Sequence, residues 1–117
     1  MKETATRLVK DMLDQLGELE AKGSPGFAAQ VLEVFLQDTT IRLTELREGL
    51  RLRDPRAAYE AAHSMQGSAS MVGAASVAEC CRKLAEASRA GSFDRCHPLA
   101  AELDVALQAI QRAALRH

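Results

Sequence analysis

An apolar residue recurs every three or four positions over residues 27–53, and this spacing limits what the segment can become. An α-helix brings residues three and four apart onto one face, whereas a half-buried strand needs strict alternation. At about 1.5 Å per residue, such a helix would span about 40 Å. The spacing therefore predicts a long amphipathic helix, one wall of a bundle, whose apolar stripe is Leu32, Phe35, Leu36, Thr39, Leu43, Leu46 and Leu50.

Glycine and proline divide the chain into five such segments joined by short connections. Asp54 and Pro55 read as an N-cap followed by proline at the first helical position, and residues 76–79 (S-V-A-E) read as a capping box. We expect helices over about 3–21, 27–53, 55–73, 76–91 and from 94 or 98 to 115. Because short loops make neighbouring helices antiparallel, the predicted fold is all-α: an antiparallel four-helix bundle with an additional N-terminal helix that caps one end.

The size and charge of the chain exclude several classes of protein. A chain of 117 residues fits one domain, here residues 1–117, and its net charge of -1 lacks the basic excess of a non-specific nucleic-acid binder. Charged residues interrupt every apolar run near the N-terminus, which excludes a signal peptide, and no window approaches the roughly 20 apolar residues of a membrane span. We expect a cytoplasmic monomer that binds neither nucleic acid nor membranes. Met1 and helices at both ends favour a free-standing protein over an excised domain.

The three cysteines indicate packing residues more than a metal or redox site. Cys80, Cys81 and Cys96 are odd in number and form no C-x-x-C pair. Cys80 and Cys81 fall within a helical apolar pattern, where small buried thiols are common.

The third segment carries a single histidine on its polar face. At about 100° per residue, the apolar residues Ala58, Ala61, Met65, Ala69 and Val72 fall on one side. The opposite side holds Tyr59, Glu60, His63, Gln66, Gly67 and Ser70. A glycine inside a helix costs about 1 kcal/mol relative to alanine, so Gly67 indicates that something approaches this face closely. We interpret the face as a docking site around an exposed imidazole.

This pattern resembles the histidine-containing phosphotransfer (HPt) domains of multistep two-component phosphorelays. The helix of that family around its reactive histidine reads H-x-L-K-G-S-[SA]-x-x-[LIV]-G, and residues 63–73 read H-S-M-Q-G-S-A-S-M-V-G. The family's F-L-x-D, C-x-x-L-E and A-R-A-G elements resemble residues 35–38, 81–86 and 88–91. The resemblance covers nearly the whole chain and implies a carrier of phosphoryl groups with His63 as the transient acceptor.

The resemblance also implies a division of labour between this chain and its partners. Response-regulator receiver domains, and in some relays a hybrid histidine kinase, are the expected partners. The receiver supplies Mg²⁺, a lysine and the acceptor aspartate, so we expect this chain to need no cofactor or metal of its own. A neutral imidazole, which in water titrates near pH 6.5, has one ring nitrogen free to attack phosphorus.

The neighbours of His63 have more limited expected roles. Gly67 would leave room for the receiver, while Glu60, Ser70 and Tyr59 would contact the partner or orient the ring. Ser68 is expected to bond to backbone and to serve packing. Gln66 departs from the family, which usually has lysine there, so the chain keeps a hydrogen-bond donor but loses a charge.

Two other classes of function are open at this stage. The first is a non-transferring HPt-like adaptor that binds a receiver or histidine kinase, for which Gln66 is the one hint. The second is a helical scaffold, which would use an apolar patch around Met71 and Val72. A self-sufficient kinase or phosphatase is disfavoured because the sequence has no Gly-rich phosphate loop or nucleotide motif.

The other two histidines, His97 and His117, read as structural or solvated residues. The chain also lacks the Glu-x-x-His repeats of a bundle metal site.

Overall fold

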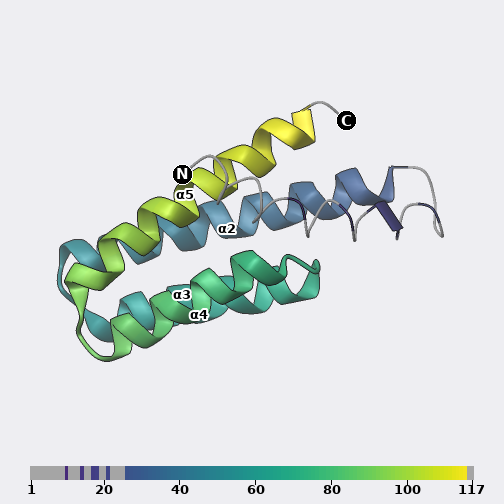
Figure 1. The fold of residues 1–117 in the computed structure, drawn as a ribbon. Coiled ribbons are helices and arrows are strands. Elements are labelled where there is room, and N and C mark those ends of the chain that lie inside the picture. The colour runs from purple at the N-terminus through teal and green to yellow at the C-terminus, as the bar shows by residue number, and fades with distance from the viewer. Residues whose placement is uncertain (1–9, 11–13, 15–16, 19–20, 22–25, 116–117) are drawn as a thin grey trace.

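Four helices run through residues 26–115 of the computed structural model, which also describes residues 10, 14, 17, 18 and 21 (Figure 1). They are α2 (Phe27–Arg51), α3 (Pro55–Met71), α4 (Ala75–Arg89) and α5 (Phe93–Leu115). The predicted N-terminal helix over 3–21, and its position as a cap on the bundle, fall largely outside the described residues. The all-helical fold class is confirmed.

The helices form a ring in which each one packs against two neighbours. α3 packs against α2 and α4, and α5 packs against α4 and α2. Neighbours along the chain run in opposite directions, and α2 extends past the turn that joins α3 to α4 (Figure 1). This is the predicted antiparallel four-helix bundle, and it leaves α3 with one face toward solvent.

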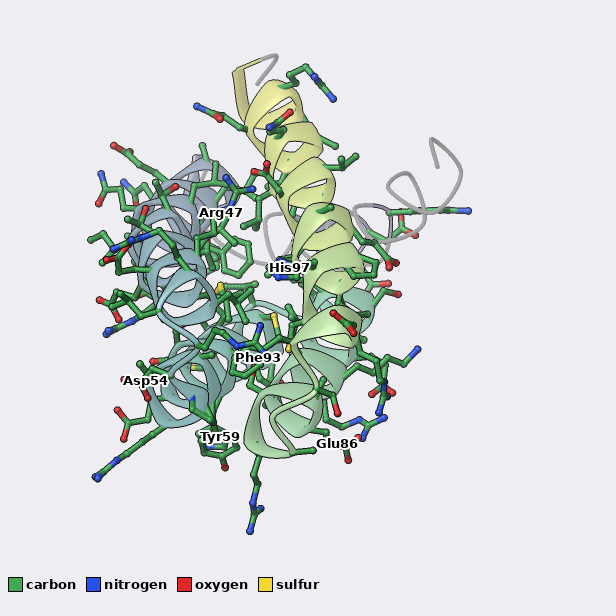
Figure 2. The ribbon with its side chains drawn as sticks, turned by 90° about the vertical axis from the view of Figure 1, so that its left-hand side faces the viewer. Arg47, Asp54, Tyr59, Glu86, Phe93 and His97 are labelled. Atoms are coloured by element: carbon green, nitrogen blue, oxygen red, sulfur yellow. The ribbon has the colours of Figure 1, made fainter. Side chains whose placement is uncertain are left out.

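The connection between α2 and α3 follows the predicted capping pattern. Asp54 accepts a hydrogen bond at Oδ1 from the backbone N of Ala57 at 3.2 Å, so it is the N-cap of α3, with Pro55 next to it. Arg53 adopts a left-handed backbone, with φ of 53°, and its guanidinium lies 4.7 Å from the centre of the Phe93 ring. Figure 2 views the bundle from this end, with Phe93 pointing between the helices. The contact joins the α2–α3 and α4–α5 connections.

The predicted capping box at residues 76–79 is wrong. α4 begins at Ala75 with Ala74 as its N-cap, so Ser76 lies inside the first turn and not before it. The turn before it explains the shift. Gly73 has φ of 77°, a left-handed conformation that glycine adopts without strain, and the backbone N of Ala74 then bonds to the carbonyl of Ala69 at 2.8 Å. The C-terminal turn of α3 thus places the N-cap of α4 at Ala74, two residues before the predicted N-cap at Ser76.

α5 begins at Phe93, close to the earlier of its two predicted starts. The backbone N groups of Arg95 and Cys96 bond to the carbonyl of Ser92, at 3.0 and 3.2 Å, and form the first turn. Pro98 lies inside the helix, where it removes one backbone donor without ending the helix.

Leucine, methionine and alanine fill the core, as the composition predicts. Large buried side chains come from every helix, and α3 contributes mostly alanine. Small residues let α3 lie close to both neighbours. The fully buried large apolar residues are Leu46, Met65, Leu84, Leu103 and Ile110.

A close approach of α2 and α3 has a testable consequence at Gly49. A Cβ added there would lie 2.9 Å from the backbone N of Ala58, and backbone atoms cannot move aside as a flexible side chain can. Overpacking of this kind costs about 1–3 kcal/mol, and the better helix propensity of alanine returns up to about 1 kcal/mol. We expect Gly49→Ala to lower the free energy of unfolding in urea by about 1–2 kcal/mol. An unchanged or higher value would contradict the close packing of α2 on α3.

The three cysteines are free and buried, which is the arrangement expected of packing residues. Burial raises the pKa of the Cys80 thiol and of the Cys81 thiol to about 12. Within the part of the chain that the structure describes, no three His, Cys, Asp or Glu side chains are grouped closely enough to hold a metal ion. None of the described helices is long and apolar enough to cross a membrane.

Candidate functional site

α3 presents His63 to solvent on the side of the helix opposite to its buried residues. His63 is exposed, while Ala61, Ala62 and Met65 beside it are buried. The alternation follows from the helical period, which places the polar residues of this segment on one face. The predicted orientation of His63 is therefore confirmed.

Tyr59, one turn before His63, stacks on the imidazole. The two ring centroids are 5.6 Å apart and the ring planes differ by 11°. Tyr59 is partly buried and packs against the core, and the guanidinium of Arg89, the last residue of α4, lies over its ring at 6.0 Å from the centroid. The sequence places Tyr59 on the same face as His63, but it does not predict the stack or the part of Arg89.

Gly67 leaves the helix surface open one turn after His63. It is exposed, and a Cβ built on it would meet no described atom within 4 Å beyond its chain neighbours and the backbone of its own helix. Ser70, the next predicted site residue on this face, is also exposed. The space beside Gly67 is thus available to a partner. The sequence predicts that something lies close to Gly67, and no neighbouring helix of the described chain does so.

The side chains of Glu60 and Gln66, on either side of the histidine, differ in exposure. Glu60 is exposed and paired with Arg56, whose Nε lies 3.2 Å from Glu60 Oε1. Gln66 is partly buried. The structure thus brings all six predicted site residues to the outer side of α3, with Tyr59 and Gln66 less exposed than the other four.

Arg82 on α4 forms ion pairs with two acidic residues of its own helix. It is 2.6 Å from Glu79 and 2.8 Å from Glu86. Its hydrogen bond lowers the pKa of the Glu79 carboxyl, and the same contact raises the pKa of Arg82. These pairs leave Arg82 poorly suited to serve as a cation for a phosphoryl group on α3.

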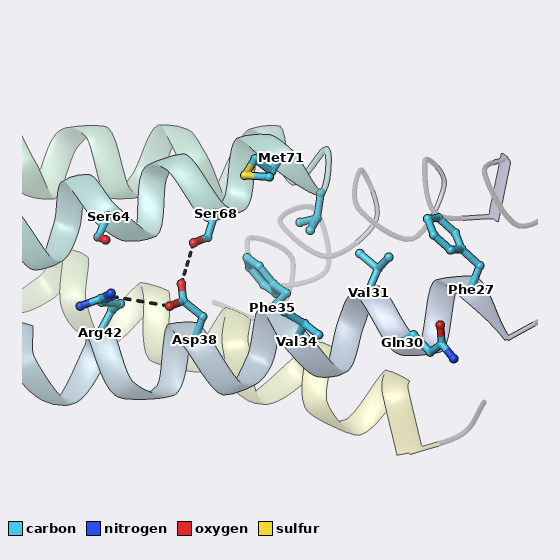
Figure 3. Close-up of a pocket in the computed structure, with 11 residues that line it drawn as sticks. Phe27, Gln30, Val31, Val34, Phe35, Asp38, Arg42, Ser64, Ser68 and Met71 are labelled. Carbon is cyan, nitrogen blue, oxygen red and sulfur yellow. Dashed lines mark hydrogen bonds and ion pairs between the residues drawn. The ribbon is translucent and has the colours of Figure 1, made fainter.

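Ser68 forms a side-chain bond to another helix, which corrects the predicted bond to backbone. Its Oγ donates to Oδ2 of Asp38 on α2 at 2.6 Å, and Arg42 Nε lies 3.6 Å from Oδ1 of the same carboxylate (Figure 3). A carboxylate accepts such bonds more strongly than a backbone carbonyl does, so Asp38 attracts the hydroxyl across the interface. Asp38 thereby ties α3 to α2 beside Gly67.

An open groove of about 610 Å³ lies between the start of α2 and the end of α3. Its apolar wall includes Phe27, Val34 and Met71, of which Met71 is 89% exposed and Val34 66% exposed (Figure 3). Ser64 and Ser68 also line it, and each follows directly after a residue of the His63 face. The groove therefore borders the face that carries the histidine.

Comparison with known proteins agrees with this geometry. The model of the Hpt domain family matches residues 30–113. Histidine-containing phosphotransfer protein 2 of Arabidopsis thaliana is 26% identical over 104 residues, which cover 86% of this chain and 67% of that protein. The crystal structure of histidine-containing phosphotransfer protein B (HptB) from Pseudomonas aeruginosa PAO1 aligns with a TM-score of 0.71 and 26% identity, over 89% of this chain and 93% of that one.

The family match runs from near the start of α2 to near the end of α5 and includes the predicted reactive segment, so it covers well over half of the chain. Proteins of this kind act as phosphocarriers rather than enzymes, and their partners are the receiver domains and histidine kinases of two-component systems. The chain belongs to the Hpt domain family, and its role is phosphotransfer in a phosphorelay.

Proposed function

We propose that His63 accepts a phosphoryl group from the aspartyl phosphate of one receiver domain and donates it to the aspartate of another. The observation that carries this proposal is an exposed imidazole beside the open surface of Gly67. A receiver can approach such a site without any movement of the bundle. The assignment of all 117 residues to one domain, and of the protein to a cytoplasmic monomer, stays a prediction.

The proposed step exchanges one phosphorus bond for another. A ring nitrogen of neutral His63 supplies an electron pair that forms the new bond to phosphorus. The bond from phosphorus to the aspartyl oxygen breaks, and the electron pair of that broken bond stays on the carboxylate of the receiver. The reverse step, on a second receiver, restores the imidazole. From the family resemblance, the distal ring nitrogen is the attacking atom.

The chemistry asks little of this chain beyond position. Phosphoryl transfer depends on in-line alignment and on charge that stabilises the equatorial oxygens. We assign the Mg²⁺ and the lysine that supply this charge to the receiver. The contribution of the HPt side is then a nucleophile at a fixed place on a rigid helix, with Ser68 and Asp38 holding that helix against α2.

The surface around His63 supports docking of a receiver. Exposed Phe27, Val34 and Met71 border the groove beside α3, and apolar surface of this kind is typical of protein contacts. Glu60, Gln66 and Ser70 are the proposed polar contacts at the edge of the imidazole. The complex should be transient, since a relay must release each receiver.

The proposal is tested by incubating the protein with a receiver that carries a labelled aspartyl phosphate. We expect label to move to this chain in a bond that acid breaks and alkali does not, with the labelled peptide containing residues 63–73. Label in a bond with the opposite stability would contradict phosphohistidine. Binding of several receivers without any label would favour the adaptor, and the departure at Gln66 is the observation behind that second candidate.

Restoring the family's usual lysine should strengthen the hold on the phosphoryl group. A charge-assisted hydrogen bond contributes about 1 kcal/mol more than a neutral one, which corresponds to about fivefold in an equilibrium constant. We expect Gln66→Lys to change the transfer equilibrium or the phosphohistidine lifetime by up to about fivefold. Gln108→Lys adds the same charge at an exposed position on α5 and should change neither quantity. Equal behaviour of the two variants would exclude position 66 from the phosphoryl environment.

A further inference from the structure

Stacking fixes an orientation for the ring of His63 that exposure alone would not. The side chain of an exposed histidine turns about two bonds, so its ring nitrogens sample several directions. Here the imidazole lies nearly parallel to the ring of Tyr59, at 11° and 5.6 Å between centroids. Aromatic pairs favour offset stacking at centroid distances of about 4.5–7 Å, so the contact has a favourable geometry.

Tyr59 is itself held by two parts of the bundle. It packs against the hydrophobic core from α3, and Arg89 at the end of α4 lies over its ring at 6.0 Å from the centroid. Cation–π contacts of this range are attractive. The Tyr59 side chain therefore couples the reactive face of α3 to the end of α4.

We propose that Tyr59 is a positioning residue for His63. Its ring restricts rotation of the imidazole plane, so that the attacking nitrogen points away from the helix toward an approaching receiver, and Arg89 restrains the Tyr59 ring in turn. The role in transfer rests on the proposed function of His63, whereas the stack itself does not. In this arrangement Tyr59 meets the imidazole ring face to ring face, so the proposed attack comes from the edge of the ring that carries the nitrogens.

A comparison of two substitutions at position 59 separates the aromatic ring from the volume it fills. Tyr59→Phe keeps the ring, and Tyr59→Leu keeps apolar volume against the core without an aromatic surface. Aromatic pairing corresponds to about two- to tenfold in an equilibrium constant. At saturating receiver, we expect the maximal transfer rate to fall about two- to tenfold in Tyr59→Leu and to recover in Tyr59→Phe, with the receiver concentration for half-maximal rate unchanged.

Proton NMR of the ring of His63 tests the stack without any phosphoryl transfer. A stacked ring shields its neighbour, so the His63 ring protons should lie upfield of those of exposed His97, and this difference should persist in Tyr59→Phe and disappear in Tyr59→Leu. Arg89→Gln alters no core residue and should reduce the difference, which keeps the test available if Tyr59→Leu does not fold.

The outcomes separate this inference from the proposed function. Absence of label on the wild-type protein would overturn phosphotransfer by His63 while the NMR result still decides whether the stack exists. Wild-type transfer with an unshifted His63 ring, or an unchanged maximal rate in folded Tyr59→Leu, would overturn the positioning role. A change confined to the half-maximal concentration would also overturn it, because that result describes docking.

Discussion

His63→Gln should accept no phosphoryl group from any receiver and yet fold as the wild type does. The imidazole nitrogen is the proposed nucleophile, and a glutamine amide has no comparable electron pair for attack on phosphorus. The exposed position of residue 63 means that the substitution removes no core packing. We expect complete loss of acid-labile label, measured after incubation with a phosphorylated receiver, and a free energy of unfolding in urea that falls by no more than the value of the Tyr59 stack, about 0.5–1.5 kcal/mol.

A second exposed histidine provides the matched control. His97 lies on α5, and α5 does not pack against α3 among the described helices. His97→Gln should accept label at the wild-type rate. Full labelling of His63→Gln, or equal loss in both variants, would contradict the assignment of His63 as the acceptor.

Substitutions at Gly67 should move stability and transfer in opposite directions. A Cβ at this position meets no described atom within 4 Å beyond its chain neighbours and the backbone of its own helix. Alanine is also more favourable than glycine inside a helix by about 0.5–1 kcal/mol. Gly67→Ala should therefore raise the free energy of unfolding by about that amount. Gly67→Leu should also fold, but its side chain would fill the space beside His63 that the receiver needs.

The expected loss of transfer follows from the demands of in-line attack. A displacement of about 1 Å between reacting groups can cost about a hundredfold in rate, and a leucine side chain would displace the receiver by more than that. We expect Gly67→Leu to transfer at least about a hundredfold more slowly, measured at one receiver concentration. A folded Gly67→Leu variant with the wild-type rate would show that no partner approaches this surface during transfer.

Much of the fold could be predicted because long-range packing and local pattern agree. The apolar stripe of α2 and the Asp54 cap of α3 are local signals, and each appears in the structure where the sequence predicts it. The start of α4 could not be predicted so well. There the turn at Gly73 and the buried Ala74 decide the boundary, whereas Ser76 carries the stronger local capping signal.

In the candidate site, too, features set by local pattern could be predicted and contacts between helices could not. Helical periodicity is sufficient to place His63 and Gly67 on one exposed face. Contacts between helices are a different matter, because they depend on the distance and rotation of two elements. The bond from Ser68 to Asp38 and the proximity of Arg89 to Tyr59 are of this kind, and so is the close approach at Gly49. The F-L-x-D element at residues 35–38 was the one sequence signal that pointed to Asp38.

The ring of helices also determines how independently parts of this protein can vary. Among the described helices, α3 packs against α2 and α4 but not against α5, so a change on α5 can reach His63 only through an intervening helix. Free-energy effects of substitutions that share no neighbours usually add, within about 0.3–0.5 kcal/mol. Exposed positions of α5 can therefore accumulate substitutions without altering the chemistry on α3, and the bundle separates a region free to diverge from one that is constrained.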